Sequence, residues 1–261
     1  MRFLDTLDAT FLTLKRTPAL WLAIVAPLFI VCIRIFLFSV EGFSLQESWH
    51  NWIEGNYSYW TGVLLLITMA LDVALLVELD RSAQIWKYLF ALPVSRTYIY
   101  ISKLIVATIL MFMSGLILLV STLLGGYLLS FLKPELGFSQ SSPEVLYYLG
   151  AILAETLAAW FVIALYLWIS LRMKNVILPL FISIVGAVTN LSGYRVVFFE
   201  EFSPWAYALD ASRMLTKFHG FQPTPVPYLG WPLPILLTIS VIGTLCIMLL
   251  GILEFNRRDI A

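Results

Sequence analysis

Long apolar runs separated by short polar segments dominate the chain. A helix needs about 20 apolar residues to cross the hydrocarbon core of a bilayer. Six runs have this character: approximately 19–40, 59–79, 101–131, 146–171, 176–192 and 232–253. All six are predicted to be helices, because an open strand would leave backbone groups unpaired in lipid. The expected fold is an all-α integral membrane protein with six transmembrane helices in one transmembrane domain, residues 1–261.

Two of these runs differ from a standard span in length. The run 101–131 is long enough to tilt or to project beyond the bilayer. The run 176–192 is short and has Pro179 near its start. We therefore expect the third helix either to tilt or to project beyond the bilayer, and the fifth run is the weakest candidate for a span.

The segment before the first run, residues 1–17, is amphipathic. Apolar residues recur in it near helical spacing, at Phe3, Leu4, Leu7, Phe11, Leu12 and Leu14. Charged residues stand between and after them. This pattern predicts an N-terminal helix lying in the cytoplasmic membrane interface, and a solvated tail is the alternative.

Two segments between the runs are rich in aromatic residues. Residues 41–58 and the start of the next run carry Trp49, Trp52, Tyr57 and Tyr59, which predicts an aromatic belt at the membrane surface. Residues 193–231 are too apolar for a free loop. They are predicted to form an external or re-entrant segment of short helices, serving either as a structural cap or as an external gate.

Composition excludes a soluble domain. Hydrophobic residues make up 61% of the 261 positions, charged residues only 12%, and the mean hydropathy is +0.90. Soluble domains have about 25% charged residues. The net charge is zero, so no nucleic-acid partner is indicated, and the lipid bilayer is the expected surrounding.

The distribution of Lys and Arg predicts the orientation. With the N-terminus in the cytoplasm, eleven of the basic residues fall inside, four fall outside, and Arg34 lies within the first run. Basic residues concentrate on the cytoplasmic side of membrane proteins. Both termini are therefore expected in the cytoplasm.

The polar connection between the second and third runs has a pattern of its own. Residues 79–95 predict a short amphipathic helix, because apolar Ile85, Trp86 and Leu89 alternate with polar positions. Pro93 disfavours helical geometry at Leu92 and ends the element, and Ser95 is available as an N-cap for the third helix. Such an element either docks a partner or is an ordinary interfacial turn.

This connection resembles a known family. The residues that carry the resemblance are Glu78, Trp86-Lys87, Leu92-Pro93-Val94-Ser95-Arg96, Lys103 and the C-terminal Glu254-Phe255-Asn256-Arg257-Arg258-Asp259. They are similar to motifs of permease subunits of type-2 ABC exporters, especially those resembling lantibiotic-immunity and other peptide or drug export permeases.

The resemblance implies that residues 79–95 form a coupling helix docked in a separate ATP-binding cassette ATPase subunit. The implied contact residues are Glu78, Ile85, Trp86, Lys87, Leu89, Pro93 and Arg96. Two ATPase copies, carrying ATP and Mg, and a second permease copy or paralogue are expected, in a bacterial plasma membrane. The implied cargo is hydrophobic or amphipathic: a peptide, bacteriocin or drug.

The chain itself lacks the chemistry for ATP hydrolysis. None of its fourteen glycines is followed by Lys, so the phosphate-binding G-x-x-x-x-G-K loop is absent. We expect no catalytic residue, no metal site and no cofactor bound by this chain, and the energy must come from the partner.

Three charged residues, Arg34, Asp72 and Glu155, fall well inside the predicted spans, away from the inner ends where Glu78 and Lys103 stand. Such residues are costly in lipid and usually face protein or water. Counted from the outer ends of their helices, Arg34 and Glu155 lie at roughly 9 and 13 Å, whereas Asp72 lies at roughly 20 Å. An Arg34–Glu155 pair is therefore predicted, and the alternative is that Arg34 reaches outward to the interface.

Two other functions are consistent with a polytopic helical protein. A proton-coupled secondary transporter would use Asp72 or Glu155, although no inverted repeat is visible. An intramembrane enzyme is suggested by Glu200-Glu201, but no Arg stands four positions on and His219 is isolated. Both remain alternatives to the exporter.

Overall fold

The computed structural model describes residues 3–15, 17–40, 49–82, 95–136, 138, 142–143, 145–173, 176–191, 203–216 and 232–257. Its elements are α1 (Phe3–Leu14), α2 (Pro18–Val40), α3 (Trp49–Tyr59), the π-helix η1 (Trp60–Leu64), α4 (Leu65–Ser82), α6 (Arg96–Leu132), the 3-10 turn η2 (Pro134–Leu136), α7 (Val145–Arg172), α8 (Ile177–Leu191), α10 (Tyr207–Thr216) and α11 (Leu233–Arg257). The described residues contain helices and no strand, which confirms the predicted all-α class.

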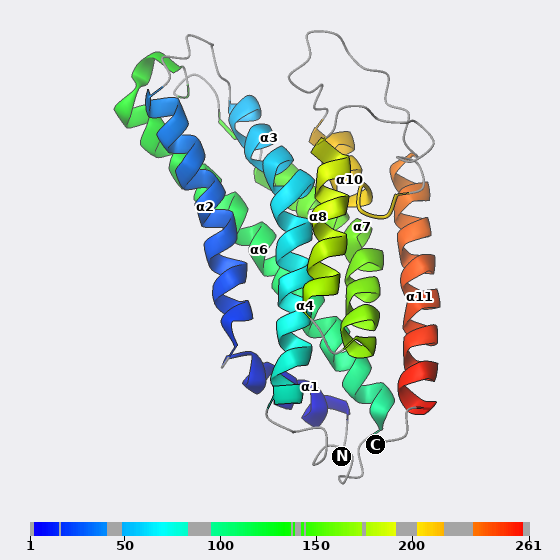
Figure 1. Ribbon diagram of the computed structural model, residues 1–261. Coiled ribbons are helices and arrows are strands. Elements are labelled where there is room, and N and C mark those ends of the chain that lie inside the picture. The colour runs from blue at the N-terminus through cyan, green and yellow to red at the C-terminus, as the bar shows by residue number, and fades with distance from the viewer. Residues whose placement is uncertain are drawn as a thin grey trace.

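Five helices of the described chain are long and apolar enough to cross a membrane: Pro18–Phe38, Trp52–Glu78, Arg96–Leu132, Val145–Arg172 and Leu233–Phe255. Figure 1 shows them side by side in one bundle. The predicted fifth run corresponds to α8, which has 15 residues and would span only about 22 Å. We call the end of the bundle that carries α1 and the end of α11 the inner end, and the opposite end the outer end (Figure 1).

The second spanning helix begins earlier than the sequence predicts. α3, η1 and α4 follow one another without a break, so the helix enters at Trp52 rather than near residue 59. Trp52 and Tyr57 are buried, and so is Trp49, while Tyr59 is exposed. The predicted aromatic belt is therefore wrong for these three residues, which face protein rather than lipid headgroups.

The longest helix, α6, has 37 residues and measures about 55 Å. This exceeds the hydrocarbon thickness of about 30 Å, and Figure 1 shows α6 running obliquely across the bundle. Ser95 occupies its N-cap with extended backbone geometry, but its side chain makes no capping hydrogen bond. Instead, the Ser95 carbonyl accepts hydrogen bonds from the backbone N–H groups of Tyr98 and Ile99.

The N-terminal helix α1 lies across the inner end of the bundle (Figure 1). Thr6 and Thr10 are buried, and the Thr10 hydroxyl donates to the Thr6 carbonyl at 2.8 Å. Leu4 and Leu12 are exposed. Thr6 and Thr10 therefore face the bundle together with the buried Leu14, and Leu4 and Leu12 are left on the outer surface of the helix.

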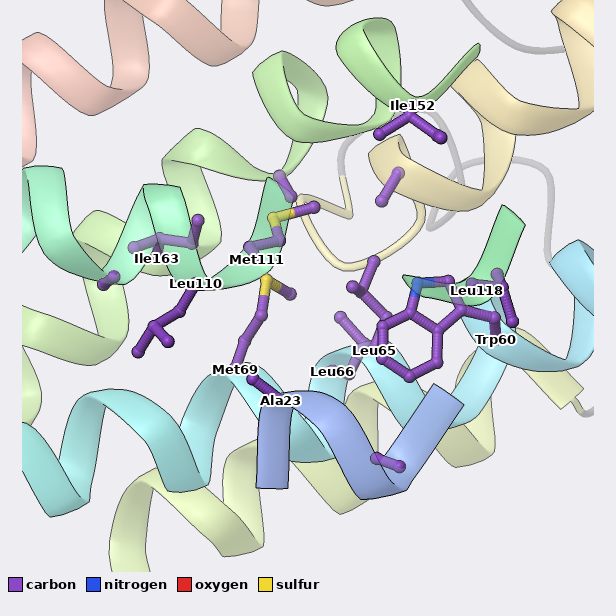
Figure 2. Packing of buried hydrophobic residues seen from close by; sticks show 14 of the residues in the cluster. Ala23, Trp60, Leu65, Leu66, Met69, Leu110, Met111, Leu118, Ile152 and Ile163 are labelled. Carbon is purple, nitrogen blue, oxygen red and sulfur yellow. The ribbon is translucent and has the colours of Figure 1, made fainter. Parts of the chain in front are cut away.

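The core lies where α2, α4, α6 and α7 meet. Figure 2 shows Trp60, Leu65, Leu66 and Met69 of η1 and α4 packed against Leu110, Met111 and Leu118 of α6, Ile152 and Ile163 of α7, and Ala23 of α2. Several buried hydroxyls in these helices bond to backbone carbonyls. Ser114 of α6, for example, donates to Ala23 at 2.9 Å and to Leu110 at 3.0 Å. Such bonds satisfy polar groups that lipid cannot.

Small residues bring α7 and α11 close together. Ser240 of α11 donates to the carbonyls of Leu157 and Ala158, at 2.8 and 2.9 Å. A Cβ on Gly243 would lie 3.0 Å from the Phe161 ring. The alanines of the fourth span are buried as close packing requires, but Gly150 is exposed with open space beside it.

Part of the segment 193–231 is described, and it forms α10. Tyr207 and Ala211 of α10 pack with Ala158 of α7 and Leu236 of α11. Just before this helix, Trp205 donates through its indole N–H to the Tyr166 hydroxyl at 3.1 Å, and Gly186 of α8 faces the Trp205 ring. These contacts pack α10 and the turn before it against the spanning helices.

Candidate coupling site and intramembrane charges

Three helices meet in a polar cluster at the inner end, which we call the inner corner. Its residues are Arg96 and Tyr100 of α6, Trp168 and Arg172 of α7, and Glu254 and Phe255 of α11. Glu254 accepts a hydrogen bond from the Trp168 indole at 2.9 Å and lies 3.7 Å from the Arg172 guanidinium. The Arg172 guanidinium also lies over the Trp168 ring, 5.4 Å from its centroid. One carboxylate therefore joins α7 to α11.

The inner corner brings together the two motifs that are far apart in the sequence. Arg96, the last residue of the Leu-Pro-x-Ser-Arg motif, donates from Nη1 to the carbonyl of Phe255 at 3.3 Å. Phe255 belongs to the C-terminal motif, 159 residues away. Neither motif predicts this contact alone, because the two residues meet only through the packing of α6 on α11.

A second contact holds the other side of the connection between α4 and α6. Lys103 of α6 is buried and donates to the carbonyl of Leu76 in α4 at 2.7 Å. Glu78 is half-buried one half-turn further along α4, which continues to Ser82. The predicted coupling helix thus starts within the last turn of α4. The connection between α4 and α6 therefore begins and ends at helices that are packed in the bundle.

Five of the seven predicted coupling residues fall in the part of the chain that the structure does not describe. Ile85, Trp86, Lys87, Leu89 and Pro93 lie outside the described residues. Glu78 and Arg96 flank them at the inner ends of α4 and α6. Sequence reasoning did not select Tyr100, Trp168 or Arg172, because no motif marks them and only the packing of α7 brings two of them to the corner.

The inner corner encloses a small cavity of about 10 Å³, lined by Tyr100, Trp168, Leu171, Arg172, Gly251, Glu254 and Phe255. This volume holds about one water molecule. The Tyr100 hydroxyl borders it, is buried, and has no hydrogen-bond partner among the described residues. Gly251 is needed beside it, because a Cβ there would lie 2.5 Å from the hydroxyl oxygen.

In the outer half of the bundle, Arg34 of α2 lies among aromatic rings. Its guanidinium carbon is 5.1 Å from the Phe38 ring centroid, 5.3 Å from that of Trp52 and 5.5 Å from that of Tyr59. The guanidinium occupies the space where a side chain at Gly55 would stand. This arrangement is a cation–π cage, which stabilises a buried positive charge.

The predicted Arg34–Glu155 ion pair is not formed. Among the ion pairs of the described chain none joins these two residues. Glu155 is buried on α7, and its neighbours are Trp60 and Tyr57. Similar depth in the membrane is not sufficient for pairing, because the Arg34 guanidinium packs on α3 instead.

We call the group around Glu155 the outer polar centre: Asn56, Tyr57, Trp60, Tyr148 and Glu155. Asn56, Tyr57 and Trp60 have no exposed surface, and Glu155 and Tyr148 are almost completely buried. The rings of Tyr57 and Tyr148 lie 6.2 Å apart at 30°. The carboxylate of Glu155 therefore lies beside aromatic residues of η1, α3 and α7, which we call the aromatic wall.

The helix that supplies this wall changes its geometry there. η1 begins at Trp60, and the backbone N–H of Leu65 donates to the Trp60 carbonyl, five residues back. The carbonyl of Gly62 accepts a hydrogen bond from Asn190 of α8 at 3.3 Å. Single π turns inside α-helices are rare and often occur at functional sites.

Asp72 lies apart from both clusters. It is buried on α4, one turn from Leu76, and its Oδ1 has no hydrogen-bond partner within the described residues. The described chain contains no group of three or more His, Cys, Asp or Glu residues placed to hold a metal ion.

Comparison with known proteins adds one finding. A family model described as "ABC-2 family transporter protein" matches residues 6–190, which cover α1 to α8. No curated protein and no solved structure matches the chain. The match favours the resemblance carried by the two motifs over a secondary transporter or an intramembrane enzyme.

Proposed function

We propose, from the premise that this chain belongs to the ABC-2 transporter family, that it is the permease subunit of an ATP-driven exporter. Members of this family are multi-pass membrane subunits of ABC transporters. The more specific proposal is that a separate ATPase docks on residues 79–95. Its movement is then transmitted to the spanning helices by the contacts of the inner corner. The ATPase binds ATP and Mg, and two copies act on a pair of permeases, either two copies of this chain or this chain with a paralogue.

One observation carries the coupling proposal: Arg96 bonds to the Phe255 carbonyl immediately after the predicted docking segment. A displacement of that segment reaches α11 through Arg96. It reaches α7 through Glu254, which is one residue before Phe255 and holds Trp168 and Arg172. On the other side, Lys103 ties the start of α6 to Leu76 of α4. Four spanning helices therefore respond to one cytoplasmic segment.

The orientation supports the same arrangement. α1 and the end of α11 lie at one end of the bundle, together with the inner corner (Figure 1). We propose that this end faces the cytoplasm of a bacterial cell, because Lys and Arg are concentrated in the segments at this end. α1 then lies in the cytoplasmic interface with Leu4 and Leu12 toward lipid.

The proposed cargo is a hydrophobic or amphipathic molecule such as a peptide, bacteriocin or drug. Buried aromatic side chains fill the outer half of the bundle, which supports a cargo with apolar or aromatic parts. Antimicrobial peptide export is the form of this function that the sequence motifs suggest.

The test is to isolate the affinity-tagged chain from its native membranes and to measure ATP hydrolysis in the eluate. We expect the wild-type chain to retain an ATPase subunit. Leu89→Asp and Trp86→Asp each place a charge in the proposed docking surface. They are expected to lower the recovered activity by about tenfold or more, as loss of a central interface residue does.

The matched control is Leu146→Asp at the outer end of α7, where the leucine is exposed and no cytoplasmic subunit reaches it. This variant is expected to keep the ATPase. Full recovery of ATP hydrolysis with Leu89→Asp, at unchanged yield of the folded chain, contradicts the docking assignment.

A further inference from the structure

Several polar atoms of the outer polar centre lack hydrogen bonds. The Tyr57 hydroxyl and both amide atoms of Asn56 are buried without a partner in the part of the chain that the structure describes. Nε1 of Trp60 and Oε2 of Glu155 are buried beside each other, and the indole faces the carboxylate without forming a well-aligned hydrogen bond. Buried polar groups are almost always hydrogen-bonded, and each exception requires an explanation. Several exceptions around one carboxylate are typical of a site that binds something.

The atoms concerned are neighbours rather than scattered. Glu155 lies beside the Trp60 indole and close to the Tyr57 hydroxyl, and Tyr57 in turn faces Tyr148. Asn56 stands one helical turn before Trp60 on the same face. Figure 2 shows the Trp60 ring in the core beside Leu65 and Leu118. Ile152, one turn before Glu155 on α7, belongs to the same core cluster. The centre is therefore a single cluster between α3–η1 and α7.

The charge of the cluster selects the kind of ligand. Glu155 forms no ion pair within the described residues, and Arg34 packs into its own aromatic cage. A buried carboxylate is costly unless a positive charge or hydrogen-bond donors compensate it. Aromatic faces bind organic cations, and ammonium groups are recognised by aromatic cages. Anions are repelled by Glu155, and an uncharged molecule leaves the charge of the carboxylate uncompensated.

We infer that the outer polar centre binds a positively charged ammonium group of the transported molecule, with Glu155 as the counter-charge and Trp60, Tyr57 and Tyr148 as the aromatic wall. This inference rests on the proposed export function and defines its substrate as a cationic amphiphile. The α-helical hydrogen-bond pattern is replaced by π geometry at η1, which borders this cluster, and single π turns of this kind often occur at functional sites.

The first experiment uses the wild-type chain in native membrane vesicles and dicyclohexylcarbodiimide, which labels carboxyl groups in apolar surroundings. Labelling of Glu155 and Asp72 is measured by mass spectrometry with dodecyltrimethylammonium, with dodecanol, or with neither, below solubilising concentrations. The ammonium probe is expected to lower Glu155 labelling by about tenfold, as for a well-occupied site. Asp72 is the internal control, because it is an equally buried carboxyl outside the cluster.

The inference is overturned if the ammonium probe leaves Glu155 labelling unchanged. It is also overturned if dodecanol protects Glu155 equally, or if Asp72 is protected to the same extent. The first two outcomes show that no site for a positive charge exists there, and the third shows a general membrane effect.

A second experiment compares Glu155→Gln with Asp72→Asn, which removes a buried charge elsewhere in the bundle. The probe is expected to raise the unfolding temperature of the wild-type chain and of Asp72→Asn, and to lose this effect in Glu155→Gln. An unchanged shift in Glu155→Gln contradicts the proposed role of the carboxylate. Should Glu155→Gln not fold, the labelling of the wild-type chain decides alone.

Failure of this inference is distinguishable from failure of the proposed function. A chain that yields no ATPase but has Glu155 protected by the ammonium probe contradicts the exporter and retains the cation site. A chain that yields an active ATPase complex with Glu155 unprotected retains the exporter and contradicts the cation site.

Discussion

The inner corner and the contact between α3 and α6 at the outer end are built from opposite kinds of interaction. At the inner corner, Arg172 and Glu254 have side chains that are 52% and 34% exposed, and they pair at 3.7 Å. At the outer end, Trp49 and Trp52 are buried and donate their indole N–H groups to the carbonyls of Phe138 and Thr122 at 2.9 and 2.8 Å.

The glycines of α6 make the outer contact close. A Cβ on Gly126 would overlap the Trp49 ring, and one on Gly125 would lie 3.3 Å from Trp52. Buried aromatic packing of this kind has no alternative arrangement of similar energy. Exposed ion pairs contribute about 0–1 kcal/mol and rearrange readily. The comparison indicates a fixed outer junction and an adjustable inner one.

The largest predicted effect tests the rigidity of the outer contact. Trp52→Ala removes a fully buried ring that packs on Phe38 at 5.3 Å and supports the Arg34 cage. We expect a loss of about 3–5 kcal/mol in the free energy of unfolding, as for other buried Trp→Ala changes. Thermal unfolding of the purified chain in detergent, followed by size-exclusion chromatography, measures it.

Its control is Trp21→Ala on α2, where the ring is 68% exposed. This change is expected to leave the unfolding temperature nearly unaltered. If both variants lose the same stability, the outer contact contributes nothing beyond the general effect of removing an indole.

The second prediction concerns the glycine that permits the contact. Gly126→Ala adds one methyl group against the Trp49 ring and is expected to cost about 1–3 kcal/mol, as overpacking does. Gly150→Ala on α7 adds the same group where no atom lies within 4 Å, and is expected to be neutral or stabilising by up to about 1 kcal/mol. The two midpoints of thermal unfolding are compared directly, and equal midpoints would refute the role of Gly126.

The sequence predicts helices well here and the partners of side chains poorly. The apolar runs correspond closely to α2, α6, α7 and α11, because in lipid the backbone must bond within its own helix. The aromatic residues before the second run were predicted to face headgroups. Tryptophan suits both an interface and a core, and the choice is made by Gly125 and Gly126, about 70 residues later.

The same limit applies to the candidate sites. Motif resemblance selected Glu78 and Arg96, and the structure adds that Arg96 bonds to Phe255. The pairing of Arg34 with Glu155 was predicted from depth alone. Depth follows from counting residues. The direction of a side chain around its helix depends instead on its neighbours, such as Gly55, which leaves space for the Arg34 guanidinium. Tyr57 and Trp60 approach Glu155 from another helix, so these aromatic neighbours were not predictable for the same reason.

The smallest effect on stability is predicted at the inner corner, and it is the most informative about function. A double-mutant cycle of Arg172→Ala and Glu254→Gln should give a coupling energy of about 0.2–1 kcal/mol, because the pair is partly exposed. Glu254→Gln also weakens the charge-assisted bond from Trp168.

If the corner transmits the motion of the ATPase to α7 and α11, ATP-driven transport falls in Glu254→Gln much more than stability does. The substrate for that assay is the cationic probe in inverted vesicles. A variant that transports at the wild-type rate would mean that α7 and α11 move without this link, and that the adjustable inner contacts are only structural.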